Sequence, residues 1–413
     1  MNVLYVTPYV PSRIRTRPYH LIRALVRLGH SVTLLTAAGT APEEQTQADE
    51  LRAWGVTVEV FPVSLTRSLR NCLQALPTRE PLQAVFSYHP GLERRLSGLL
   101  REEAFDVLHI EHLRAARFVR SVRETPTVYD AVDCISLLFE QAIQHGAQLR
   151  SRLMTAVDLA RTRRYEAWLL SQYNQVVVTS QRDKDALEAL AHRYLPPEAQ
   201  TAPVTVVTNG VDLEYFNPSN FQPPTSNLQP PTVIFTGKMS YHANVAAALY
   251  FARQVMPHIW AQAPDVRFQI VGKDPPEAVQ QLTTDERIQV TGTVDDLRPY
   301  LAQAAVAVCP ALYAVGVQNK VLEALAMGTP VVSTPAGCAA LAVEEGRDVL
   351  IAKGTEKLAA AVLWALSDHA LAERLAVAGR QYVEAHHSWE SGARRLVEIY
   401  EEAHSEARKT KTS

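Results

Sequence analysis

The sequence predicts an α/β protein of two domains, each built on a doubly wound parallel sheet. The chain has 413 residues, more than one typical domain of roughly 100–200 residues. Short apolar segments alternate with amphipathic stretches along its whole length, which is typical of β-α-β units. The alternation is interrupted at residues 216–231, where Pro, Ser, Asn and Gln replace any periodicity. Such a composition indicates a linker between two domains.

The first domain is predicted to span residues 1–215. It opens with a short apolar strand, Val3–Thr7, followed by a loop and an amphipathic helix, Tyr19–Leu28. Gly29 then leads into a second apolar strand, which completes a β-loop-α-β unit. The later elements expected in this domain are strand Ser31–Thr36, helix Glu43–Trp54, strand Val56–Phe61, strand Val107–Ile110, strand Thr127–Tyr129, a helical region over Cys134–Tyr173, strand Gln175–Thr179 and strand Thr205–Val207.

The second domain is predicted to span residues 232–387, and a terminal helix within 388–413 is assigned to the first domain. The alternation restarts here, so a second sheet with helices on both faces is expected. The expected elements are strand Val233–Thr236, helix Asn244–Ile259, strands Phe268–Val271, Ile288–Val290 and Val306–Cys309, helix Val317–Met327, strand Thr329–Ser333, strand Val349–Ile351, and helices Glu356–Leu366, Leu371–His386 and Trp389–Ala407.

Composition excludes several classes of protein. The composition, with 47% hydrophobic and 20% charged residues, is that of an ordinary globular protein, and the net charge of −2 argues against nucleic acid or a membrane as a partner. No apolar run reaches the roughly 18 residues of a transmembrane helix, so no integral membrane segment is expected. The four cysteines form no Cys-x-x-Cys pattern and fit reduced thiols. The N-terminus reads as a strand and not as a signal peptide. We therefore expect a cytoplasmic protein, with peripheral membrane contact left open.

The strongest chemical signal lies in residues 314–332, which read as a loop, a short helix and a strand. The loop contains Gly316 and no acidic residue. A helix N-terminus presents free N–H groups and a partial positive charge, to which Lys320 adds a full charge. Glu323 lies on the same side by its i,i+3 spacing. This combination suits the phosphates and ribose of a nucleoside diphosphate, although a surface Lys–Glu pair is the alternative.

This stretch reads Gly-x-x-Asn-Lys-x-x-Glu-Ala-x-Ala-x-Gly-x-Pro-Val-Val and resembles the signature of retaining GT-B glycosyltransferases of family four. The family form has two glutamates eight residues apart. Glu323 matches the second, which the resemblance implies binds ribose. Val315 stands in the place of the first, so the carboxylate expected to contact the donor sugar is missing. The resemblance extends over nearly the whole chain and is strongest from residue 204 to 337.

The resemblance implies two Rossmann-like domains, with a nucleotide-diphosphate sugar on the second domain and the acceptor on the first. Gly237 and Lys238 follow the second domain's first strand, where the family grips the diphosphate with Gly-Arg or Gly-Lys and a further Lys. Ala243 and Asn244 occupy the place of that further Lys, and Lys320 could replace its charge. Residues 271–275 give a weaker signal of the same kind.

A third segment, over residues 291–297, resembles the part of the family whose backbone meets the nucleotide base. The alternative for it is an ordinary turn capped by Asp295. The donor site implied by the resemblance consists of Gly237, Lys238, Gly292, Thr293, Val294, Gly316, Val317, Gln318, Asn319, Lys320 and Glu323.

Three arginines, Arg13, Arg15 and Arg17, occupy alternate positions after the first strand. In an extended loop their guanidiniums would face one side and could bind an anionic part of the acceptor, such as a sugar phosphate, by bidentate contacts. A solvated loop, or salt bridges to the second domain, is the alternative.

Polar residues after two further strands complete the predicted acceptor site. The family often has His-x-His after the strand at 107–110; His109 matches the first, Glu111 takes the second place, and His112 is adjacent. Any of the three could bond sugar hydroxyls. Asp130 and Asp133 follow the next strand, and either could orient an acceptor hydroxyl.

Residues 183–185 have the Asp-x-Asp spacing of a metal motif, but they read as charges at a helix N-terminus. The resemblance also implies that no metal is needed, so no metal and no cofactor is predicted.

The expected activity is transfer of a hexosyl group from a nucleotide-diphosphate sugar, such as UDP-glucose, to a hydroxyl with retention of configuration. The predicted catalytic residues are Lys238, Lys320, Glu111 and His112, the lysines stabilising the departing diphosphate. The expected acceptor is a phosphorylated sugar such as fructose 6-phosphate, and the reaction would then be of the sucrose-phosphate synthase type. Two alternatives are a peripheral enzyme of exopolysaccharide or glycolipid assembly, and a sugar-nucleotide-binding protein that has lost catalysis.

Overall fold

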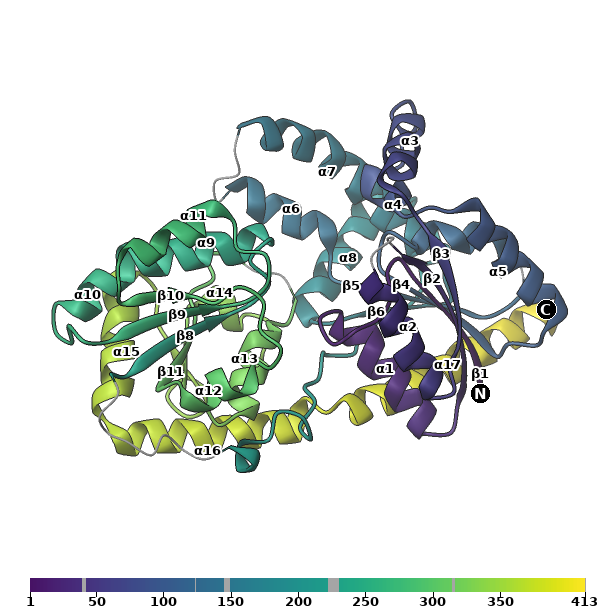
Figure 1. The fold of residues 1–413 in the computed structure, drawn as a ribbon. Helices are drawn as coiled ribbons and strands as arrows, with labels where there is room; N and C mark the ends of the chain where they lie inside the picture. The colour runs from purple at the N-terminus through teal and green to yellow at the C-terminus, as the bar shows by residue number, and fades with distance from the viewer. Residues whose placement is uncertain (39–41, 123, 145–148, 222–229, 314–315, 413) are drawn as a thin grey trace. The chain divides into compact units, whose positions relative to one another are not determined.

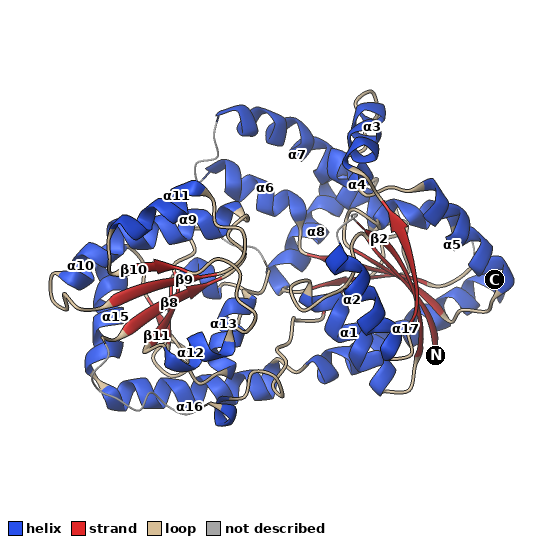
Figure 2. Ribbon diagram, in the orientation of Figure 1, coloured by secondary structure: helices blue, strands red, loops and turns tan. Residues whose placement is uncertain are grey.

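The computed structural model describes residues 1–38, 42–122, 124–144, 149–221, 230–313 and 316–412. The chain forms two compact units, residues 1–208 with 389–413, and residues 209–388. Each unit is a sheet of parallel strands with helices on both faces (Figures 1 and 2). The predicted fold class is confirmed.

The first unit contains a seven-stranded sheet in the order β3-β2-β1-β4-β5-β6-β7. Every pairing in it is parallel, with Tyr5 opposite His109 and Glu111 opposite Asp130. The strands are β1 (Asn2–Thr7), β2 (Ser31–Ala38), β3 (Thr57–Pro62), β4 (Val107–Glu111), β5 (Thr127–Val132), β6 (Gln175–Val178) and β7 (Val204–Val206).

Helices cover both faces of this sheet because alternate residues of each strand point to opposite sides. On β1, Leu4 and Val6 pack into one core with α5, while Val3 and Tyr5 pack into another with α1 and α17. The helices are α1 (Thr16–Arg27), α2 (Pro42–Ala53), α3 (Leu65–Ala75), α4 (Leu82–Phe86), α5 (Pro90–Glu102), α6 (Ile135–Gln144), α7 (Leu149–Leu169), α8 (Gln181–Tyr194) and α17 (Trp389–Thr412), with a 3-10 turn at Ala116–Ser121.

The second unit contains a six-stranded parallel sheet in the order β10-β9-β8-β11-β12-β13. Phe235 of β8 faces a core with the helix that follows it, and Ile234 faces a core with α13. The strands are β8 (Thr232–Thr236), β9 (Arg267–Val271), β10 (Ile288–Val290), β11 (Val306–Cys309), β12 (Val331–Ser333) and β13 (Leu350–Ile351).

The helices of the second unit complete its two outer layers. They are α9 (His242–Tyr250), α10 (Met256–Trp260), α11 (Glu277–Gln280), α12 (Arg298–Gln303), α13 (Asn319–Ala326), α14 (Pro335–Cys338), α15 (Thr355–Ser367) and α16 (His369–His386), with 3-10 turns at Pro218–Asn220 and Gln281–Thr284.

The structure corrects several element boundaries. The helix predicted over Val317–Met327 is shorter, Asn319–Ala326, and ends before Gly328, whose φ of 66° suits a C-terminal stop. The helix predicted over Asn244–Ile259 is α9 and α10 joined by a π-helical turn, Phe251–Val255.

Three helices of the first unit, α3, α4 and α5, carried no sequence prediction. Pro90 and Gly91 suggest a turn, yet Pro is well suited to the first helical position. His89 caps α5, because its Nδ1 accepts from Gly91 N at 3.1 Å. The predicted linker falls largely on residues 222–229, outside the described residues. None of the helices described is both long and apolar enough to span a bilayer.

Candidate functional site

In each sheet the strand order changes direction between two central strands, β1 and β4 in the first unit and β8 and β11 in the second. In open parallel sheets ligands bind at the carboxyl ends of the strands beside such a reversal. The predicted site residues lie at these strand ends, so each unit presents a candidate half-site.

Three glycine-bearing loops meet after β8, β9 and β10. Gly237 N donates to Val271 O at 3.0 Å, and Gly272 N donates to Gly292 O at 3.2 Å. A Cβ added at Gly272 would lie 1.8 Å from Gly237 O. Only glycine therefore permits this approach, which leaves a backbone surface at the strand ends. Gly237 and Gly292 were predicted; Gly272 was only part of a weaker signal.

The side chain of Lys320 lies across the first of these loops. Its Cε would be 3.3 Å from a Cβ at Gly237, and its Nζ donates to Gln318 Oε1 at 3.0 Å. Asn244 also faces Gly237 and donates to Lys238 O at 2.9 Å. The structure thus brings Lys320 of α13 and the loop after β8 together, although they are far apart in sequence.

Glu323 lies one turn further along α13 and is half-buried. Burial raises its pKa to about 7, while the nearby Lys320 ammonium opposes that shift. Hydroxyl donors that reach this carboxyl would favour its ionised form, which accepts hydrogen bonds. Gly316 precedes the helix with a φ of 63°. Val315, at the position of the missing family glutamate, lies outside the described residues.

The other predicted donor residues lie on the same loops. Lys238 and Thr293 are exposed, Val294 is half-buried, and Val317 is buried. Asn319 begins α13, where its Oδ1 accepts from Asn209 Nδ2 at 3.3 Å.

The turn after residue 292 is not the ordinary turn capped by Asp295 that was the alternative interpretation. Asp295 does not cap the helix that follows; Asp296 Oδ1 accepts from Arg298 N at 2.9 Å instead.

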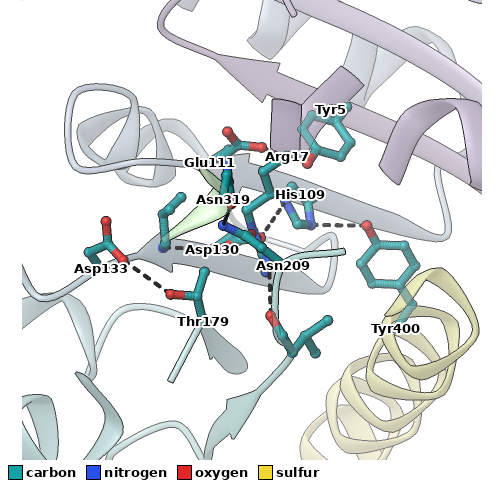
Figure 3. Close-up of polar contacts among 12 residues, drawn as sticks. Tyr5, Arg17, His109, Glu111, Asp130, Asp133, Thr179, Asn209, Asn319 and Tyr400 are labelled. Atoms are coloured by element: carbon teal, nitrogen blue, oxygen red, sulfur yellow. Dashed lines mark hydrogen bonds and ion pairs between the residues drawn. The ribbon is translucent and has the colours of Figure 1, made fainter. Parts of the chain in front are cut away.

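In the first unit, a buried polar cluster fills the ends of β4 and β5 (Figure 3). Arg17 Nε donates to Asp130 Oδ2 at 2.7 Å, and Arg17 Nη1 donates to Val207 O at 2.9 Å. Burial raises the pKa of Asp130, and the Arg17 guanidinium opposes that rise. The cluster therefore contains one compensated ion pair.

Glu111 is fully buried beside that pair. Tyr5 donates to its Oε2 at 2.8 Å and Tyr9 to its Oε1 at 3.2 Å. Burial, together with the Asp130 charge, raises the Glu111 pKa to about 8. Arg17 compensates one carboxylate, so Glu111 is mainly protonated at neutral pH.

Both histidines of this segment are neutral. Burial and the Arg17 charge lower the pKa of His109 well below its usual value, and its Nδ1 is 2.9 Å from the Tyr400 hydroxyl. Burial and Arg114 lower the pKa of His112 to about 3. Because His112 Nδ1 accepts from Arg114 N at 3.2 Å, we assign its proton to Nε2. Half-buried His112 can therefore donate to a ligand, whereas His109 packs internally.

The backbone is strained at the ends of both strands. His112 has a φ of 71° and Val132 a φ of 66°. Positive φ is uncommon for any residue other than glycine, and a β-branched residue such as valine adopts it least. The pairing of β5 with β6 is irregular between Asp130 and Val132. Asp133, which accepts from Thr179 Oγ1 at 3.1 Å, has a pKa raised to about 7 by burial and by Asp183.

The expectation that three arginines face one side of an extended loop is wrong. Helix α1 begins at Thr16, so Arg17 turns inward and its side chain is only 4% exposed. Arg15 Nη1 lies 3.1 Å from Glu44 Oε1, and Arg13 Nη2 lies 3.9 Å from Glu50 Oε1. The helix start separates the three guanidiniums, and Arg17 stabilises the fold of the strand ends.

His109, Glu111 and Asp130 each bring a potential metal-ligand atom within 4.8 Å of the others. The atoms of Glu111 and Asp130 already accept from tyrosine hydroxyls and from Arg17. A guanidinium at the same position opposes a further cation. The arrangement therefore fits an internal hydrogen-bond network. Asp183 is likewise structural, since it accepts from Cys134 N at 2.9 Å in the first turn of α8.

Several residues of these half-sites carried no prediction. Tyr5 and Tyr9 come from β1 and its loop, and Tyr400 comes from the distant α17. Tyrosines on an apolar strand or helix give no signal of their own, because their partners are set by the tertiary fold.

Comparison with known proteins identifies the family. A model described as "Glycosyl transferase 4-like domain" matches residues 14–210, and one described as "Glycosyl transferases group 1" matches residues 230–368. Glycogen synthase of Mycobacterium tuberculosis is 24% identical over 415 residues, covering 97% of this chain and 94% of the relative.

Two solved structures share the fold. Anabaena HepE, in complex with UDP and glucose, has a TM-score of 0.66 at 15% identity, over 97% of this chain and 99% of the other. Sucrose-phosphate synthase from Thermosynechococcus elongatus has a TM-score of 0.64 at 18% identity, over 97% and 98%. The two sheets, the matched domains and these relatives together lead to one conclusion: the chain is a glycosyltransferase of the GT-B fold, with a 4-like domain followed by a group 1 domain.

Proposed function

We propose that this enzyme transfers a hexosyl group from UDP-glucose, or a similar UDP-sugar, to a hydroxyl of a phosphorylated sugar, with retention of configuration. The donor would bind the loops after β8, β9 and β10 and the start of α13. The observation that carries the proposal is the position of Lys320, whose side chain crosses Gly237 beside the half-buried Glu323.

The chemistry of the donor half-site supports a leaving diphosphate. Charge develops on the phosphate oxygens as the glycosidic bond breaks, and preorganised donors stabilise it. Lys320, Lys238 and the backbone N–H groups at the start of α13 would supply such donors. Glu323 would accept from ribose hydroxyls. HepE, a structural relative, was solved with UDP and glucose, which favours a UDP-sugar among donors.

The side chains of the acceptor half-site are mostly uncharged, which favours hydrogen bonding to the acceptor over strong general-base catalysis. The half-buried His112 imidazole is neutral and can hydrogen-bond a sugar hydroxyl, whereas the fully buried Glu111 carboxyl already accepts from Tyr5 and Tyr9. The leaving diphosphate would then take the proton of the incoming hydroxyl. Arg15 and Arg13 remain the candidates for an acceptor phosphate, since their side chains keep 37% and 62% exposure.

The phosphorylated acceptor is favoured by this exposed arginine pair and by the fold shared with a sucrose-phosphate synthase. Fructose 6-phosphate is the first acceptor to test. A screen of UDP release with UDP-glucose and a panel of free and phosphorylated sugars, with the product identified by mass, would decide between acceptors. Turnover only with unphosphorylated or lipid-linked acceptors would contradict this part of the proposal.

Replacing Lys320 tests the donor half-site. We expect Lys320→Ala to lose turnover by about 10²–10³, since one preorganised donor to the developing charge is removed. The matched control is Lys357→Ala, at an exposed position of α15 in the same unit, which should keep full turnover. Circular dichroism should show both variants folded.

A Lys320→Ala enzyme with unchanged turnover would remove the electrostatic basis of the proposal. Because lysines and helix N–H groups take the role that a cation would have, turnover should also persist in EDTA. Loss of turnover in EDTA, restored by a divalent ion, would contradict this account of the donor half-site.

A further inference from the structure

Helix α3 presents a stripe of leucines to solvent. Leu65, Leu69, Leu73 and Leu76 are 68%, 54%, 66% and 51% exposed. Their spacing of four, four and three residues places them on one face of the helix. Single exposed leucines are ordinary, but a continuous apolar stripe marks an interaction surface.

The rest of α3 explains why these leucines are not needed for folding. The helix is held through small and polar residues: Ser68 and Ala75 are buried, and Asn71 Nδ2 donates to Val85 O at 3.1 Å and to Tyr88 O at 2.9 Å. An ordinary surface helix buries its apolar stripe against the core. Here the apolar stripe points away, and α3 projects from its unit in Figure 1.

The segment that carries the stripe is positively charged. Residues 63–79 contain Arg67, Arg70 and Arg79 and no acidic residue. Among the residues described, none of these three guanidiniums lies within ion-pair distance of a carboxylate. Arg67 and Arg70 also line a hollow of about 540 Å³ beside the helix, together with polar residues and no acidic one.

We propose that α3 docks this enzyme on an anionic lipid bilayer. The leucine stripe enters the boundary between headgroups and acyl chains, while the arginines keep their stems along the apolar surface and their guanidiniums at the phosphates. Anionic headgroups complement a segment that carries three positive charges and no negative one.

A bilayer fits this surface better than a second copy of the chain. A helix of 11 residues is about 16 Å long, and one stripe on it falls well short of the roughly 800 Å² per partner of a stable interface. A two-fold contact through α3 would also place arginines of one copy against those of the other. A lipid surface imposes neither limit.

This inference goes beyond the proposed function, because it concerns where the enzyme acts and not what it transfers. A bilayer-bound enzyme can use a free sugar phosphate or a lipid-linked acceptor equally well. The α3 residues lie outside both half-sites, so the two proposals can fail separately.

Vesicle co-sedimentation of the full-length enzyme tests the docking. We expect binding to vesicles of equal parts phosphatidylglycerol and phosphatidylcholine, little binding to phosphatidylcholine alone, and weaker binding as salt rises. The double variant Leu69→Glu/Leu73→Glu should lower the partition coefficient at least about tenfold, because apolar contact is replaced by charge. Arg67→Gln/Arg70→Gln should remove the preference for anionic vesicles.

The matched control is Val377→Glu, which places the same charge at a 53% exposed apolar position of α16 and should bind like wild type. All variants should keep the wild-type thermal midpoint and UDP release, since the altered leucines, Arg70 and Val377 are exposed and Arg67 is only half-buried. Failure of the wild-type enzyme to bind anionic vesicles, or wild-type binding by the leucine variant, would overturn the proposal. A leucine variant that changes only a concentration-dependent elution volume would assign the stripe to a second copy instead.

Discussion

At the residue scale, the most consequential feature is the way the first unit tolerates two carboxyls and a guanidinium at the ends of β4 and β5. Arg17 compensates Asp130 across 2.7 Å. Glu111 has no cation of its own, so burial favours its protonated form. Its two oxygens accept from Tyr5 and Tyr9, so this carboxyl belongs to the internal hydrogen-bond network of the strand ends.

The titration of Glu111 should be visible in stability. Its pKa rises from 4.5 to about 8 on folding, so the native state binds more protons than the unfolded state within that window. Glu111 therefore stabilises least at high pH, and its contribution is lost as pH rises through about 8. We expect Glu111→Gln, which stays neutral, to become more stable relative to wild type from about pH 5 to about pH 8, by at most ~1.4 kcal/mol per pH unit.

Urea unfolding of both proteins across that range measures this difference. Comparing variant with wild type cancels the buried carboxyls Asp133, Glu166 and Glu323, whose pKa values are also raised. Asp130 interacts with Glu111, so its titration contributes to the measured difference. Glu198→Gln, at an exposed position, is the matched control and should track wild type at every pH. Parallel pH profiles for Glu111→Gln and wild type would show that Glu111 is ionised in the folded protein.

At the element scale, the donor half-site depends on how closely the loops after β8, β9 and β10 approach. Their backbones hydrogen-bond directly, Gly237 N to Val271 O and Gly272 N to Gly292 O. Side chains are excluded from the contact, which leaves backbone groups to face a ligand.

Gly272→Ala should therefore separate these loops. The new Cβ would lie 1.8 Å from Gly237 O, and a backbone atom cannot rotate away as a side chain can. We expect a loss of about 1–3 kcal/mol in unfolding free energy and a weakening of UDP binding by at least about tenfold, measured by calorimetry.

Gly98→Ala serves as its control. This glycine lies within α5, and the nearest atom to an added Cβ belongs to the flexible Glu102 side chain at 3.7 Å. Alanine should stabilise that helix by roughly 0.5–1 kcal/mol and leave UDP binding unchanged. Wild-type UDP affinity in Gly272→Ala would mean that the loop contact does not shape the donor half-site.

At the scale of the whole molecule, the first unit is completed by the last helix of the chain. Leu396, Ile399 and Tyr400 of α17 are fully buried in the core that also contains Val3 and Leu21. Tyr400 reaches His109, 291 residues earlier in the sequence. The first unit therefore reaches its final packing only when the whole chain is present.

Leu396→Ala should show this dependence. Removing a fully buried leucine side chain leaves a cavity, and we expect a loss of about 2–5 kcal/mol in unfolding free energy, read from urea denaturation. Arg394→Ala, two residues earlier with a side chain 63% exposed, should change stability by no more than about 1 kcal/mol. Equal effects of the two substitutions would mean that α17 does not pack on the first unit as described.

Much of this architecture was predictable from local pattern. β-branched and aliphatic runs marked the strands, and glycine after a strand or helix marked its end, as at Gly29 and Gly328. Prediction failed for α5, which begins with a histidine cap followed by Pro90 and Gly91, and for α3, which is held to its unit by small and polar residues. It also failed for Arg15 and Arg17, because a helix start at Thr16 changes the direction of neighbouring side chains.

By itself the sequence determined the fold class and the succession of the strands, and it singled out the segment around Lys320 and Glu323, because hydrophobic periodicity and helix-end chemistry are local properties. Only the tertiary structure decided which polar groups meet: Lys320 with Gly237, Arg17 with Asp130, His109 with Tyr400. It also decided that the leucines of α3 face solvent. These outcomes depend on burial and on contacts between distant segments, and neither is encoded in the spacing of nearby residues.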